Sequence, residues 1–251
     1  MGQYKYVVFN KDGEMRNSIT VFVVFCILQT GSVFGADFII QQGDNYDSFE
    51  VSESWFGTPT PIVDMTGGRV GNLYTYDSST FNMYGGVTED IVAQGNSTIN
   101  LLDGTFGLTS MNSLYLLDYA SLNVTDGYIY SLLIAEESST VKVYNGSSNY
   151  LALYDNTIAD IYGGNIGSQG GPIEIDPTAT LTIHGYNFVF DPGKPGSWLS
   201  ELTGDGLYGV PITIIGIPDP YTSENIHLVP EPGTLVLFTL GGLFSLKRRI
   251  K

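Results

Sequence analysis

A short strand motif recurs along the chain with a period of about 20 residues. Each copy has apolar residues at its first and third positions, a polar residue between them, and a glycine shortly afterwards. The copies begin at Val63, Phe81, Ile99, Leu122, Val141, Ala159 and Leu181. Because side chains alternate along a strand, each copy points its apolar pair to one face, and the glycine permits the positive φ of a sharp corner. Self-similarity at this period predicts a stacked solenoid.

We therefore expect an all-β fold, a parallel β-solenoid of about seven ~20-residue coils. The repeats occupy residues 62–186, with an N-terminal cap at 37–61 and a C-terminal cap and linker at 187–228. Within the C-terminal cap, Leu202 to Ile215 has the pattern of a terminal hairpin, and Ser223 to Leu228 is expected to be the linker. A β-sandwich also shows strands every 8–12 residues and is the alternative. The constant phase of the glycine corners favours the solenoid.

The charge between Asp37 and Leu228 is strongly acidic, with 23 Asp and Glu against three Lys and Arg. Such a surface repels nucleic acid and anionic lipid, so neither is expected as a partner. The carboxylates suit solvation, or weak binding of divalent cations. The single cysteine, Cys26, lies in the N-terminal apolar run, so the body is expected to be stable without disulfides.

The sequence offers no convergent catalytic group, and we expect no enzyme, cofactor or metal site. A polysaccharide lyase needs cations and a base, and the body has three basic residues. A glycoside hydrolase needs two carboxylates across a cleft, whereas the adjacent pairs Glu89-Asp90 and Glu136-Glu137 point to opposite faces of a strand. His184 occupies a repeat position and is expected to be a repeat variant. A carbohydrate-active enzyme on the same scaffold is the alternative function.

Three tyrosines hold equivalent positions in different copies: Tyr84, Tyr144 and Tyr162. Exposed tyrosines on a flat face stack on sugar rings, which would make this face a glycan-binding module. A tyrosine ladder that stabilises the coils explains the same spacing. The sequence leaves both interpretations open.

The N-terminus has the pattern of a secretory signal peptide over residues 1–36. Arg16 precedes the apolar run Ile19 to Leu28, and small residues follow up to Ala36. Because Asp12 and Glu14 lie before the apolar run, Met15 is a better start for such a signal than Met1. We expect an exported protein.

The last stretch, residues 229–251, has three parts in a fixed order. Pro230-Glu231-Pro232 comes first, then 14 uncharged residues from Gly233 to Leu246, then a basic end. An apolar run followed by cations is a stop-transfer pattern, whose basic end stays in the cytoplasm. The sorting residues are Val229, Pro230, Glu231 and Pro232, and the stop-transfer cations are Lys247, Arg248, Arg249 and Lys251.

This arrangement closely resembles the PEP-CTERM sorting signal of exported bacterial proteins. The resemblance implies processing near the triad by an exosortase, a membrane transpeptidase-like enzyme, and a link to the exopolysaccharide matrix of biofilms. It implies a membrane-held intermediate at the inner membrane, then a place at the cell surface or in the extracellular matrix. We expect a non-enzymatic structural or adhesive protein there, with exosortase and matrix exopolysaccharide as partners.

Overall fold

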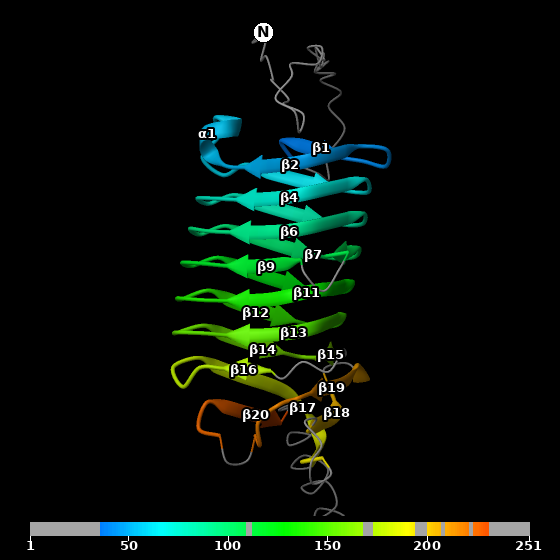
Figure 1. Ribbon diagram of the computed structural model, residues 1–251, viewed down its shortest axis with the longest axis vertical. Coiled ribbons are helices and arrows are strands. Elements are labelled where there is room, and N and C mark those ends of the chain that lie inside the picture. The colour runs from blue at the N-terminus through cyan, green and yellow to red at the C-terminus, as the bar shows by residue number, and fades with distance from the viewer. Residues whose placement is uncertain are drawn as a thin grey trace, which may run out of the picture. The chain divides into compact units, whose positions relative to one another are not determined.

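The fold is a parallel β-solenoid, as the sequence predicted, and a sandwich is excluded (Figure 1). The computed structural model describes residues 36–108, 112–167, 173–193, 200–206, 209–220 and 223–230. The predicted signal peptide up to Gly35 and the predicted membrane segment Gly233–Leu246 lie outside them. Each coil contributes one segment to sheet A and one to sheet B, which enclose the core between them.

Sheet A contains β1 (Phe38–Ile40), β3 (Ile62–Met65), β5 (Thr80–Met83), β7 (Thr98–Leu101), β10 (Ser121–Val124), β12 (Thr140–Val143), β14 (Ile158–Ile161), β17 (Thr180–Asp191) and β20 (Ile226–Pro230). Sheet B contains β2 (Asn45–Val51), β4 (Arg69–Thr75), β6 (Val87–Ala93), β8 (Thr105–Phe106), β9 (Ser113–Leu116), β11 (Tyr128–Ala135), β13 (Ser147–Leu153), β15 (Gly164–Ile166), β16 (Glu174–Ile175), β18 (Glu201–Asp205) and β19 (Pro211–Ile215). The short helix α1 (Glu53–Phe56) follows β2.

The predicted inward column is confirmed residue by residue. Parallel pairing aligns the first positions of all seven copies, from Val63↔Phe81 through Leu122↔Val141 to Ala159↔Leu181. These side chains are at most 1% exposed. Since the third positions are buried as well, each strand of sheet A presents alternate residues to the core.

Glycine is required at one corner of each coil. Gly127 has φ +100°, and a Cβ there would lie 2.9 Å from the carbonyl oxygen of Gly104 in the preceding coil. The opposite corner uses residues with side chains in the left-handed region, including Asp118 (φ 58°) and Asp155 (φ 53°). Asp tolerates this conformation because its short polar side chain bonds locally.

The N-terminal segment differs from a separate cap, because its strands already belong to the solenoid. β1 and β2 pair in parallel with β3 and β4. Aromatic rings do cover the end of the core: Phe38 and Phe49 have centroids 5.3 Å apart, Tyr46 and Phe49 5.2 Å. Phe56 of α1 lies 6.5 Å from Phe38 and completes this plug.

The predicted C-terminal hairpin is confirmed, since β18 and β19 pair in antiparallel fashion from Glu201↔Ile215 to Asp205↔Pro211. The predicted linker at Ser223 to Leu228 is wrong for its second half. Ile226 to Pro230 forms β20, which pairs in parallel with β17. Ile226 is 4% exposed and Leu228 packs against the core, so burial holds this segment on sheet A.

Candidate functional site

The outer face of sheet A carries a ladder of side-chain amides along the stack. Asn82 donates from Nδ2 to Oδ1 of Asp64 at 2.8 Å, and Asn100 donates to Oδ1 of Asn82 at 2.7 Å. Asn123 donates to Oδ1 of Asn100 at 2.8 Å. These are the polar middle positions of the repeat motif, which in-register pairing places one above another. The ladder links four successive coils through their side chains.

An aromatic stack continues the same face toward the C-terminal end. The rings of Tyr144 and Tyr162 lie 4.9 Å apart at 6°, and those of Tyr162 and His184 lie 4.3 Å apart at 14°. Both faces of Tyr162 are therefore covered by neighbouring rings. Burial, with the charge of Asp160 and the neighbouring Tyr144 as smaller causes, raises the pKa of Tyr162. This stack is the tyrosine ladder, one of the two interpretations that the sequence left open.

His184 completes that stack rather than standing alone. Its Nε2 lies 2.8 Å from Oδ1 of Asp160, one coil earlier. Tyr84, the third predicted tyrosine, is 38% exposed and lies in an earlier coil than Tyr144 and Tyr162. Of the three tyrosines predicted to hold equivalent positions, the structure thus stacks Tyr144 on Tyr162, and His184 extends this stack by one ring.

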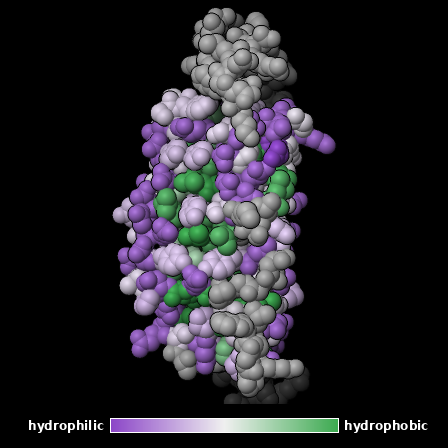
Figure 2. Space-filling model, in the orientation of Figure 1, coloured by the Kyte–Doolittle hydropathy of each residue, from purple (hydrophilic) through white to green (hydrophobic). Residues whose placement is uncertain are grey.

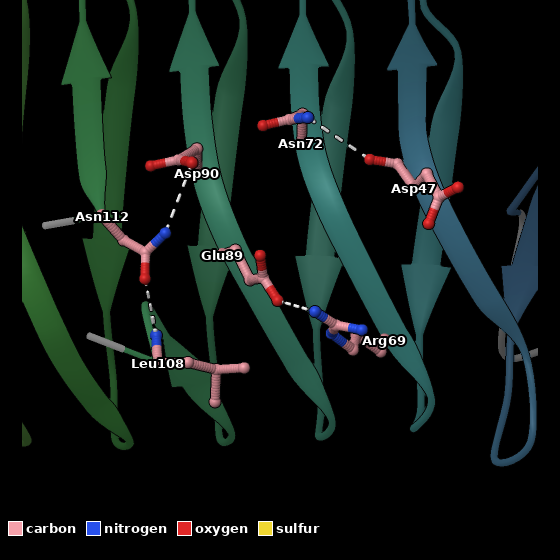
Figure 3. A network of polar contacts seen from close by, with 7 residues as sticks. All are labelled: Asp47, Arg69, Asn72, Glu89, Asp90, Leu108 and Asn112. Carbon is pink, nitrogen blue, oxygen red and sulfur yellow. Dashed lines mark hydrogen bonds and ion pairs between the residues drawn. The ribbon is translucent and has the colours of Figure 1, made fainter. Parts of the chain in front are cut away.

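The prediction that Glu89 and Asp90 point to opposite faces of a strand is wrong, because both are partly exposed between the buried residues Thr88 and Ile91. Both carboxylates are bound to neighbouring coils of sheet B (Figure 3). Glu89 forms an ion pair with Arg69 of the preceding coil. Asp90 accepts from the backbone N–H of Ser113 at 2.8 Å and from Nδ2 of Asn112 at 3.3 Å. These contacts fasten the start of β9, where the chain re-enters the sheet after β8.

A row of carboxylates marks the corner of left-handed residues. Asp118 accepts from the N–H of Gly95 at 3.0 Å, Glu137 from that of Asp118 at 2.7 Å, and Asp155 from that of Glu137 at 3.2 Å. Each carboxylate therefore bonds the backbone of the preceding coil. Within the described ranges, no group of His, Cys, Asp or Glu has an arrangement that would hold a metal ion.

A carboxylate–phenol cluster on sheet B was not predicted from the sequence. Tyr154 donates to Oε2 of Glu174 at 2.5 Å, and Tyr150 also hydrogen-bonds this carboxyl. The bond to Glu174 and burial raise the pKa of Tyr154 to about 12. Hydrogen bonds from both tyrosines lower the pKa of Glu174. The cluster depends on the pairing of β13 with β16, in which Leu153 is the register partner of Ile175. Because a break in the strand separates β15 from β16, the sequence does not reveal this register.

The side of the body on which β4, β6, β11 and β13 lie in front shows apolar residues in separate groups between hydrophilic ones (Figure 2). Groups of this kind are ordinary on the surface of a folded protein. Among the described residues that are coloured in this view, these groups do not merge into one continuous apolar patch.

The predicted sorting residues begin on the last strand of sheet A. Val229 pairs with His184 and Pro230 with Gly185, as the final residues of β20. Proline lacks an N–H for a further ladder bond, so Pro230 suits a strand end. Glu231, Pro232, Lys247, Arg248, Arg249 and Lys251 lie outside the described residues.

Among the described residues, no helix has the length and apolar character needed to cross a membrane. No curated protein and no solved structure matches the chain. The family model of the PEP-CTERM protein-sorting motif matches residues 228–251. The chain thus carries this sorting motif behind a β-solenoid body, and the motif implies a protein that an exosortase sorts to the cell exterior.

Proposed function

We propose that this protein is a non-enzymatic structural or adhesive component of the cell surface or of the exopolysaccharide matrix. It reaches that place through an intermediate held at the inner membrane by residues 233–251. The exosortase then processes it near Pro230-Glu231-Pro232, and the solenoid body stays outside the cell.

The observation that carries this proposal is that the carboxylates that could act in catalysis are bound to neighbouring coils of the solenoid. Glu89 and Asp90, a candidate acid pair, are engaged by Arg69, Ser113 and Asn112. Glycoside hydrolysis needs one carboxylic acid and one carboxylate facing a sugar bond across a cleft. Carboxylates held by ion pairs and backbone N–H groups instead stabilise an elongated scaffold.

The repeat architecture supports the same proposal. A solenoid is extended along one axis and presents the same positions coil after coil, which suits a surface or matrix component that makes many equal contacts. The acidic composition between Asp37 and Leu228, with 23 Asp and Glu against three Lys and Arg, keeps such a body hydrated.

The test is a screen of the exported, processed protein against a panel of polysaccharides for binding and for release of reducing sugars. The proposal predicts binding or matrix retention without sugar release. Sugar release that is abolished by Glu89→Gln or Asp90→Asn would contradict it and support the carbohydrate-active enzyme.

A further inference from the structure

Acidic residues are distributed unevenly over the solenoid. The body has 23 of them, yet the strands of sheet A carry Asp64, Asp160 and, at the far end of β17 where it pairs with β18, Asp191. The remainder lie at the corners, on sheet B and in the terminal segments. Lys142 of β12 also lies in this sheet, so the outer face of sheet A carries few charges on a strongly anionic protein.

The two acids within this face are already engaged. Asp64 is 4% exposed and accepts from Asn82, and Asp160 is bonded to His184. Between them, Lys142 of β12 pairs in register with Asn123 and Asp160, and β5, β7 and β10 present neutral polar side chains. We call these the neutral face: Thr80, Asn82, Thr98, Asn100, Ser121 and Asn123.

The neutral face is a regular array of hydrogen-bonding groups. Hydroxyl groups form one row and amides form the next, and in-register pairing repeats both rows at roughly 4.8 Å per coil. An Asn amide has two N–H groups, of which the ladder uses one. Each rung thus keeps donors and acceptors, at a spacing near the length of one sugar unit in an extended chain.

We propose that the neutral face binds an extended neutral polysaccharide that runs along the axis of the stack. This inference rests on the proposed function and names the ligand class and its surface. Charge selects the occupant, because an acidic polysaccharide is repelled by a body with 23 Asp and Glu against three Lys and Arg, whereas a neutral chain is not. Rows of hydroxyl and amide groups replace the hydrogen bonds that the sugar hydroxyls make with water.

The experiment measures retention of the exported, processed protein on insoluble cellulose and, in parallel, on alginate as the acidic polysaccharide. Thr98→Asp and Thr80→Asp, made singly, should weaken retention on cellulose at least about tenfold, because the bound chain would desolvate the new carboxylate. Thr105→Asp is the matched control, because Thr105 lies half-buried on the opposite sheet. It should bind as the wild type does.

Melting temperatures of all variants establish that they are folded. If an Asp variant does not fold, Thr98→Val keeps the side-chain shape, removes one hydroxyl and should bind measurably more weakly. Three results would each overturn the proposal: stronger retention on alginate, equal loss for Thr98→Asp and Thr105→Asp, or no retention of the wild type on cellulose. Sugar release or failed processing would instead refute the proposed function. The retention of the protein on cellulose could still be interpreted independently of that outcome.

Discussion

Asn100 donates a hydrogen bond from its side-chain amide to Oδ1 of Asn82, one coil earlier, at 2.7 Å. The two residues are exact register partners in adjacent strands of sheet A. Side-chain ladders of this kind add to the backbone pairing of stacked parallel strands. The bond joins two outward positions that the sequence pattern alone does not connect.

Asn100→Asp should therefore destabilise the protein by about 1 kcal/mol, because a carboxylate replaces the donor and faces the Oδ1 acceptor of Asn82. Asn96→Asp makes the same chemical change at an exposed corner and should stay within about 0.5 kcal/mol of the wild type. Urea unfolding measures both. Equal effects of the two variants would show that the ladder contributes nothing to stability.

Gly127→Ala tests the close approach of coils at the glycine corner. The positive φ of Gly127 alone costs an alanine about 1–2 kcal/mol. The Cβ contact with the Gly104 carbonyl oxygen should add about 1–3 kcal/mol, as overpacking does. Gly43→Ala is the control, because Gly43 has φ +97° and nothing lies within 4 Å of its added Cβ. If both variants melt at the same temperature, the corner is not packed as described.

The lowered pKa of Glu174 predicts that the free energy of unfolding depends on pH. Hydrogen bonds from Tyr154 and Tyr150 hold its folded pKa below the ordinary value of 4.5. The stabilisation is thus present above pH 4.5 and is lost as the pH falls through the lower folded pKa. Tyr154→Phe should make the free energy of unfolding less sensitive to pH in this acidic range. Tyr119→Phe, at a side chain 65% exposed, should leave the profile unchanged.

At alkaline pH the free energy of unfolding changes in the opposite direction. The pKa of Tyr154 is raised from 10.0 to about 12, so its contribution is complete below pH 10 and is lost as the pH rises toward 12. The same two variants measure this range. A Tyr154→Phe profile identical to that of the wild type on both sides would contradict the carboxylate–phenol cluster.

Much of the solenoid could be predicted because its inward column depends on a pattern along the chain. Period-2 alternation and glycine corners placed Val63 through Leu181 correctly. The first coil was missed because Ile39, 49% exposed, occupies an outward position that is polar in the other copies. The final strand was missed because Pro230 stands where those copies turn toward a glycine.

The candidate surfaces were harder to predict, since they depend on contacts between coils. The positions of Tyr144 and Tyr162 were found, but which faces of the rings are covered depends on His184 in the next coil. The Asn ladder needs a side-chain conformation that no spacing rule encodes. The cluster of Tyr150, Tyr154 and Glu174 needs the register across a break in sheet B.

The most direct test of the account is the intact mass of the exported protein from a host that has an exosortase. The account predicts a mature chain that lacks the basic end from Lys247 to Lys251. Replacing Pro230, Glu231 and Pro232 with alanine should leave the precursor uncut and bound to the membrane. Wild-type protein at the cell surface that still carries an intact C-terminus would contradict the account.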